Sequence, residues 1–124
     1  MNCVRIKEGV TFNITQETIP AMAHMLSALD MIARLILHDL TITSAADGQH
    51  SGPEDPHPLG RALDIRSKDL SDKQIVLNKI KLFLGDEKFY IFLEDPLSPN
   101  ATEEEKAQSN EHFHLQVRHG VEYP

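Results

Sequence analysis

The sequence predicts an α+β fold, in which a small antiparallel sheet packs against two helices. Two segments repeat apolar residues at spacings of three and four, as helices with one buried face do, at residues 19–38 and 71–85. Short runs rich in β-branched or aromatic residues predict the strands, at residues 40–43, 61–66, 89–93 and 112–117. With 124 residues, 40% of them hydrophobic and 25% charged, the chain is most simply one domain over residues 1–124.

The N-terminal part leads into the longer helix. Residues 4–15 alternate loosely between apolar and polar side chains, which predicts an extended segment or a short hairpin that turns at Glu8–Gly9. Thr15 or Thr18 then offers a side-chain cap for a helix that tolerates Pro20 in its first turn. The Met and Leu stripe of this helix is expected to pack in the core.

The next predicted strand ends at Ser44, and an irregular loop follows it. Residues 45–59 are dense in Gly, Pro, Asp and His, a composition typical of loops that carry functional groups. In the strand over residues 61–66 the side chains alternate, so Ala62 and Asp64 share one face. An aspartate between two apolar residues is costly to bury without a partner, which favours a ligand role for it.

The C-terminal half should contain the second helix and the last two strands. Ser71 is expected to cap this helix, and Gly85 to end it. Residues 95–110 are expected to form a loop with room for one exposed helical turn before the final strand, residues 112–117. Glu94, at the end of the preceding strand, should lie beside that final strand.

The composition limits which classes of partner and which cellular compartment are expected. A formal net charge of −7 argues against a protein that binds duplex nucleic acid, which would need Lys and Arg on one face. The single cysteine, Cys3, excludes an internal disulfide and is expected to be a strand residue without chemistry. We find neither a signal-peptide pattern nor an apolar run of transmembrane length, so we expect synthesis in a cytoplasm, no membrane partner and a monomer.

A metal site is the strongest chemical hypothesis from the residues themselves. His57 and Asp64 lie on a Gly-containing turn that runs into a strand, where both can reach one side of a sheet edge. In an extended strand His112 and His114 point to the same face, and one of them would be the third ligand. Zinc accepts such nitrogen and oxygen ligands, and a catalytic site leaves the fourth position to water.

Two carboxylates compete for the role of general base. Glu111 precedes His114 by three residues, a spacing from which it could accept a proton from metal-bound water. A bound metal already lowers the pKa of that water towards roughly 7, so the carboxylate needs only to relay the proton. Glu94 is the alternative base, and the better spacing favours Glu111.

These residues resemble the zinc D-Ala-D-Ala carboxypeptidase family, which includes phage endolysins that cut L-alanyl-D-glutamate bonds and the related hedgehog signalling domain. The motifs that carry the likeness are the run Ile42-Thr43-Ser44, the pattern His57-x6-Asp64 with Gly60 and Ala62 inside it, and Glu111-x-x-His114. The likeness covers about residues 41–117, most of the chain.

By position, the resemblance implies that His57, Asp64 and His114 bind Zn²⁺ and that Glu111 is the base. His50 resembles a further histidine near the metal in the hedgehog-like branch. His112 or His50 would steady the oxyanion of the tetrahedral intermediate.

Two departures from the family concern substrate recognition. Where many members carry Ser before the first ligand histidine, this chain has Asp55, and where many carry Arg after the Thr-Ser strand end, residues 45–48 read Ala-Ala-Asp-Gly. Arg66 shares the face of Asp64 if the strand stays regular, whereas Arg61 lies on the other face. We therefore expect Arg66 to be the substrate anchor, in an endopeptidase that cuts within the stem peptide.

The resemblance implies a zinc metallopeptidase that cleaves peptidoglycan stem peptides, of the L-Ala-D-Glu endopeptidase or the D-Ala-D-Ala carboxypeptidase type. Because the chain has no signal peptide, it would act at the cell wall after release, as a phage endolysin, or as part of a virion, as a tail-associated enzyme. The alternative is a catalytically silent zinc-binding module of the hedgehog-like fold. A third hypothesis is a metal-free protein whose histidines are incidental.

Overall fold

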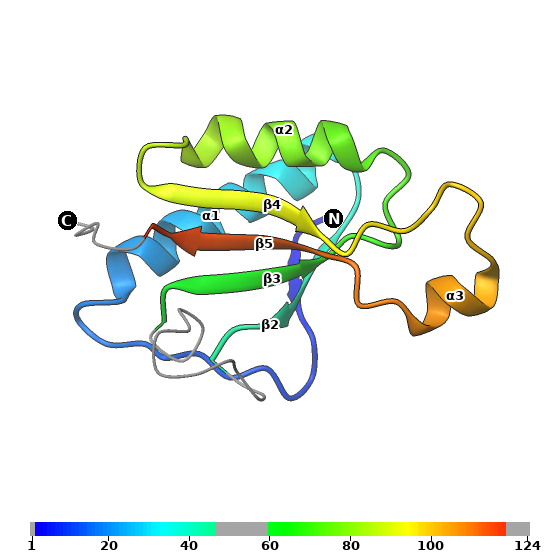
Figure 1. Cartoon of the computed structure of the whole chain (residues 1–124). Helices are drawn as coiled ribbons and strands as arrows, with labels where there is room; N and C mark the ends of the chain where they lie inside the picture. The colour runs from blue at the N-terminus through cyan, green and yellow to red at the C-terminus, as the bar shows by residue number, and fades with distance from the viewer. Residues whose placement is uncertain (1, 47–59, 119–124) are drawn as a thin grey trace.

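The computed structural model of the chain describes residues 2–46 and 60–118, and it confirms the predicted α+β class. The strands are β1 (Val4–Ile6), β2 (Leu40–Ser44), β3 (Ala62–Arg66), β4 (Phe89–Glu94) and β5 (His112–Val117). The helices are α1 (Ile19–Ile36), α2 (Lys73–Leu84) and α3 (Glu103–Gln108). Figure 1 shows how the strands lie side by side beneath α2, with α3 beyond the end of the sheet.

The strands form one five-stranded sheet in the order β1-β2-β3-β5-β4. The pairs β2–β3, β3–β5 and β4–β5 are antiparallel, as predicted, but β1 pairs parallel to β2. The hairpin alternative for residues 4–15 is therefore wrong, because after the turn at Glu8–Gly9 the chain does not return along β1. Antiparallel sheets commonly bury one face and expose the other to polar surroundings.

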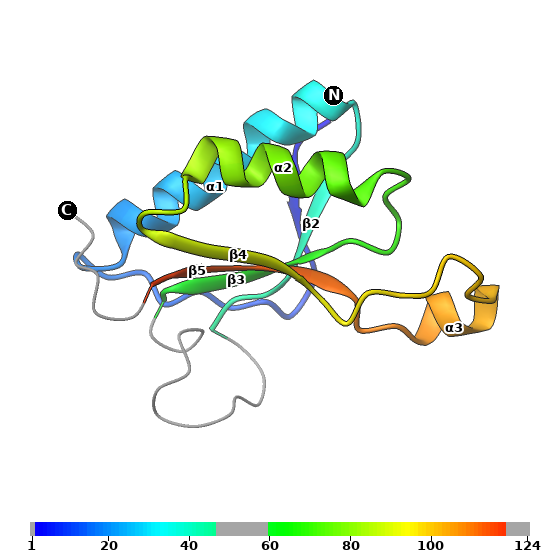
Figure 2. The ribbon, with the colours of Figure 1, turned by 45° about the horizontal axis from the view of Figure 1, so that its top comes forward.

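Helices α1 and α2 cover the same face of the sheet, as Figure 2 shows from the side. The core between helices and sheet is closed by fully buried side chains, among them Met25, Leu29, Ile32, Phe113 and Leu115. The opposite face carries no helix in the described part of the chain. Polar side chains on that open face can therefore meet a ligand.

The ends of α1 differ from the prediction in detail. Thr18 occupies the N-cap position, yet its Oγ1 donates to the carbonyl of Asn13 at 2.8 Å and does not cap the helix. The helix ends at Ile36, before His38, because Leu37 adopts a left-handed conformation with φ 57°. By length and composition α1 could cross a membrane, with a mean hydropathy of 1.3, but the core helix of a soluble protein passes the same test.

The second helix begins one residue later than predicted. Asp72, and not Ser71, is its N-cap, accepting a hydrogen bond from the N–H of Ile75 at 3.1 Å. Gly85 ends the helix with φ 78°, as predicted. In the excursion between β4 and β5, the expected helical turn is α3, which Thr102 caps.

The strand register decides which side chains share the open face. Asp64 of β3 lies directly opposite His114 of β5, and Arg66 lies opposite His112. On the other side of β5, Glu94 of β4 also lies opposite His112. Since directly opposed residues point to the same face, the register brings candidate residues of three strands together.

Candidate active site

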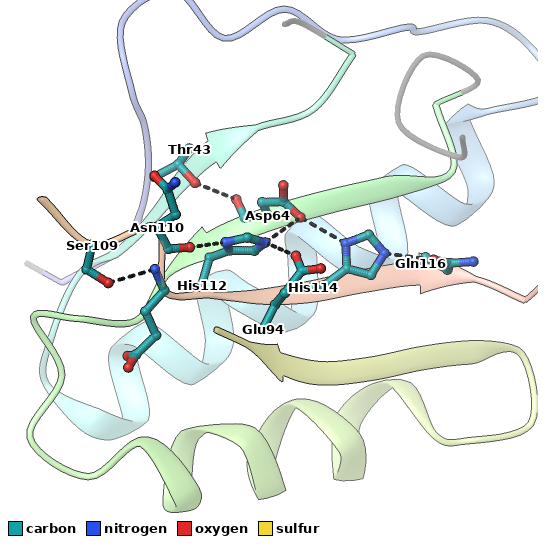
Figure 3. A network of polar contacts seen from close by, with 9 residues as sticks. Thr43, Asp64, Glu94, Ser109, Asn110, His112, His114 and Gln116 are labelled. Carbon is teal, nitrogen blue, oxygen red and sulfur yellow. Dashed lines mark hydrogen bonds and ion pairs between the residues drawn. The ribbon is translucent and has the colours of Figure 1, made fainter. Parts of the chain in front are cut away.

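The centre of the candidate site is a contact between Asp64 and His114. Oδ1 of Asp64 lies 2.9 Å from Nδ1 of His114, and both side chains are largely buried, with 15% and 9% exposed. On the other side of the ring, Nε2 of His114 lies 2.7 Å from Oε1 of Gln116. Figure 3 shows these side chains in one row along β3 and β5.

This arrangement fits a metal ligand pair. A neutral imidazole carries one proton, and if Nε2–H donates to Gln116, Nδ1 turns a lone pair towards a carboxylate oxygen. Two acceptors this close together can both bind one cation that lies beside them. Histidine ligands in metal sites usually donate their second ring N–H to an oxygen in this way, so Gln116 matches the role of an orienting group around His114.

His112 is held in a similar orientation. Its Nδ1 lies 2.5 Å from the carbonyl oxygen of Asn110, to which it can donate. Its Nε2 lies 2.5 Å from Oε2 of Glu94 and 3.7 Å from Oδ1 of Asp64. Among the described residues, this buried nitrogen has no partner in hydrogen-bonding geometry. The ring therefore brings a second nitrogen between two carboxylates (Figure 3).

The predicted ligand set is only partly within the described residues. Asp64 and His114 are adjacent, whereas His57 and His50 lie outside the described residues. Within residues 2–46 and 60–118, no three His, Cys, Asp or Glu side chains form a group that could hold a metal ion. The donor chemistry of the adjacent pair, one imidazole and one carboxylate, suits zinc.

Glu111 lines the same polar cavity as Asp64, but its carboxylate pairs with other groups. Its Oε1 accepts hydrogen bonds from the Ser67 hydroxyl and the Lys73 ammonium, both at 2.6 Å, and its Oε2 accepts one from the N–H of Leu97 at 2.6 Å. The side chain is 0% exposed. All three donors come from outside the row of residues on the open face, so the carboxylate of Glu111 is already occupied.

The environment of Glu111 also sets its charge. Burial raises the pKa of this carboxyl, but the hydrogen bonds from the Leu97 N–H, the Lys73 ammonium and the Ser67 hydroxyl, with the charge of Lys73, together lower it below the ordinary value. A general base works best with a pKa near the operating pH. Glu111 instead has the properties of a structural carboxylate.

Glu94, the alternative candidate for the base, lies on the open face of the sheet beside His112. It ends β4 opposite His112, its carboxylate lies against the His112 ring, and its side chain is 45% exposed. The ring of Phe92, one pleat away on the same face, packs against that of His114 with centroids 5.0 Å apart. The alternative base is therefore the carboxylate that the fold brings beside the Asp64–His114 pair.

A polar cavity of about 460 Å³ lies along this row of residues. Asp64, Glu94 and His112 line it, and so do three cationic side chains, those of Lys7, Arg66 and Lys68. Arg66 thus faces the same space as Asp64, as strand alternation predicts. Within the described residues, the guanidinium of Arg66 forms no ion pair or hydrogen bond.

Several contributors were missed from the sequence. Gln116 follows His114 at the strand period of two, a signal that could have been used. Asn110 acts through its backbone, and Lys7 comes from a distant strand end, so neither has a local signature. The roles of Ser67 and Lys73 could be recognised only once the direction of the Glu111 side chain was known.

Comparison of the chain with protein-family models, curated protein sequences and solved structures finds no match. The likeness to the zinc carboxypeptidase family therefore depends on the motifs alone.

Proposed function

We propose that the protein is a zinc-dependent peptidase that cleaves peptidoglycan stem peptides. The observation that carries the proposal is the contact between Asp64 and His114 on the open face of the sheet, with the Glu94 carboxylate beside it. Two predicted ligands distant in the sequence are adjacent, and a second carboxylate, that of Glu94, lies on the same face of the sheet. Clustered histidines and carboxylates at a cavity are typical of functional sites.

The zinc ligands in this proposal are Asp64, His114 and His57. Zinc bound there would polarise the scissile carbonyl and lower the pKa of a bound water. Gln116 would hold the His114 ring so that Nδ1 stays unprotonated and directed at Asp64. The largely buried position of the pair strengthens the electrostatic interactions between its groups.

We assign the base to Glu94 in preference to Glu111. The Glu94 carboxylate, whose side chain is 45% exposed, would accept a proton from the attacking water and return it to the nitrogen of the leaving amine. His112, with Nδ1–H donated to the Asn110 carbonyl and Nε2 beside Glu94, would steady the oxyanion as an imidazolium that donates its Nε2–H. Glu111 is unsuited to that task because three donors occupy its oxygens.

Substrate recognition would use the cationic wall of the cavity. Lys7, Arg66 and Lys68 line the same space as Asp64 in a chain whose net charge is −7. A substrate with a carboxylate near the scissile bond would find its counter-charge there. Because terminal D-Ala also carries such a carboxylate, the cationic wall suits both cleavage types. The preference for an endopeptidase, cutting for example at the L-Ala-D-Glu bond, rests on residues 45–48, which read Ala-Ala-Asp-Gly where many family members carry Arg.

The second candidate is a zinc-binding module without catalysis. The observation in its favour is the burial of Glu111, the residue that the family motif makes the base. The two candidates differ in Glu94, which a silent module would not need. Action at a cell wall, as a phage endolysin or a tail-associated enzyme, belongs to the first candidate.

The direct test is digestion of purified peptidoglycan by the zinc-loaded protein, with mass spectrometry of the released fragments. The proposal expects new amino termini within the stem peptide, and their loss when a chelator removes the metal. Zinc binding without any new terminus would favour the silent module. Release of D-Ala alone would retain the peptidase but exclude the endopeptidase.

A further inference from the structure

One wall of the cavity belongs to a long excursion between β4 and β5. This excursion carries α3 and contributes Asp95, Ser109 and Asn110 to the cavity lining. Asn110 also supplies the carbonyl that accepts a hydrogen bond from His112. The position of the excursion therefore decides both the shape of the wall and the orientation of a site histidine.

Glu111 closes this excursion at its base. Its Oε2 accepts the N–H of Leu97, fourteen residues earlier in the chain, at 2.6 Å. The N–H of Glu111 donates in turn to Oγ of Ser109 at 2.9 Å. Residues near the two ends of the excursion, Leu97 and Glu111, thus meet at one carboxylate.

The same carboxylate is fixed to the body of the protein. Its Oε1 accepts from Ser67, just after β3, and from Lys73, the first residue of α2. Removing the acceptor would leave the buried Ser67 hydroxyl and the Leu97 N–H without a partner, a costly state. Lys73 is 28% exposed and could turn to water.

We propose that Glu111 is a positioning residue, a clamp that holds the excursion against α2 and β3 and so keeps the Asn110 carbonyl on His112. The part of the inference that concerns catalysis rests on the proposed function, but the clamp itself does not. A clamp predicts local opening when Glu111 is removed, because a loop with few buried apolar residues has little else to hold it. No residue of α3 is buried.

Amide hydrogen exchange, read residue by residue by NMR, tests the clamp without any substrate. In Glu111→Leu the Leu97 amide should exchange at least tenfold faster than in the wild type, while amides in the centre of β5 change less than threefold. Glu104→Leu, an exposed glutamate on α3, is the matched control and should leave Leu97 unchanged. If Glu111→Leu does not fold, Glu111→Gln replaces it, and the Leu97 amide should again exchange faster than in the wild type, by a smaller factor.

Unchanged protection of Leu97 in folded Glu111→Leu or Glu111→Gln overturns the clamp. Ser67→Ala removes one donor but leaves the Leu97 contact, so its Leu97 amide should exchange within twofold of the wild type. A tenfold increase in Ser67→Ala would mean general loosening of the core, which also overturns the specific role of Glu111.

The catalytic arm uses the zinc-loaded protein and a stem-peptide substrate. Glu111→Gln should raise KM by about threefold to tenfold and leave both zinc content and the pH profile of kcat in place. A hundredfold fall in kcat with Leu97 protection intact would make Glu111 the base and overturn the clamp. If the wild type cleaves no stem peptide, the proposed function fails, and the exchange measurement still decides the clamp.

Discussion

Nδ1 of His114 lies 2.9 Å from Oδ1 of Asp64, although the two residues are fifty positions apart in the chain. The register of β3 and β5 produces this contact, because it places Asp64 directly opposite His114. The next opposed pair on the same face is Arg66 and His112, which extends the site towards the cavity. The predictions that follow depend on this register and on the groups around it.

Glu94→Gln should reduce kcat for a stem peptide by about a hundredfold or more, the usual contribution of a positioned general base. The amide keeps the size of the carboxylate but cannot accept the proton from water. Because Glu94 is not one of the proposed zinc ligands, zinc content should stay the same. Steady-state kinetics with parallel metal analysis makes the measurement. A variant with the turnover of the wild type would exclude Glu94 as the base.

Glu111→Gln should destabilise the protein by about 1–3 kcal/mol near neutral pH, the value of hydrogen bonds to a charged group. The folded-state pKa of Glu111 is below its ordinary 4.5, so its stabilisation is complete above that value. Below it, the unfolded state takes up the proton first, and the stabilisation is lost as pH falls through the folded-state pKa.

Urea unfolding of wild type and Glu111→Gln from pH 7 down to pH 3 measures this difference. The two curves of unfolding free energy against pH should converge at the acid end. Glu104→Gln, on the exposed helix α3, should run parallel to the wild type throughout. A constant difference for Glu111→Gln would mean that its ionisation is not linked to folding.

Gly60→Ala should cost more stability than Gly85→Ala, by about 1–3 kcal/mol, the range for overpacking. Both glycines have positive φ, 73° and 78°, so both substitutions introduce backbone strain. A Cβ at Gly60 would also come within 2.7 Å of the Asn13 carbonyl oxygen and of Thr18 Cγ2, whereas Gly85 has no neighbour within 4 Å among the described residues. Thermal unfolding of both variants isolates the steric part, and equal losses would contradict the close approach.

Arg66→Ala should raise KM for a stem peptide with a carboxylate beside the scissile bond by about tenfold, the equivalent of one charge-assisted contact. An amidated form of the same peptide should show a smaller effect, because it lacks the group that Arg66 would bind. Arg34→Ala, on α1 and paired with Asp30, is a control away from the cavity. Equal KM changes for both peptides would remove Arg66 as the anchor.

Much of the fold could be predicted because local patterns coincide with the tertiary structure. The alternation of residues 61–66 fixed the shared face of Asp64 and Arg66, and Gly85 marked a helix end that its positive φ requires. The parallel pairing of β1 could not be predicted, because a strand of three residues is too short for its sequence pattern to indicate which strand it pairs with. The cap shifted from Ser71 to Asp72 because both residue types can cap, and local sequence does not separate them.

The side chains that share the open face were more predictable from the sequence than the surroundings of Glu111. Side-chain alternation in the last strand predicted that His112 and His114 share one face. The strand register then places Asp64 opposite His114 and Glu94 opposite His112. Spacing favoured Glu111, but a residue three positions before His114 falls on the other face of a regular strand. Ser67, Lys73 and Leu97, which surround Glu111, are distant in sequence and left no local signal.

The most direct test of the account is the zinc content of the purified protein together with its melting temperature before and after chelation. The account predicts about one zinc per chain and a lower melting temperature in chelator, because a metal that binds only the folded state stabilises it. His114→Ala should lose the metal, whereas His24→Ala, on α1, should keep it. A wild type without zinc, or one whose melting temperature ignores the chelator, would contradict the assignment of Asp64 and His114 as a metal-binding pair.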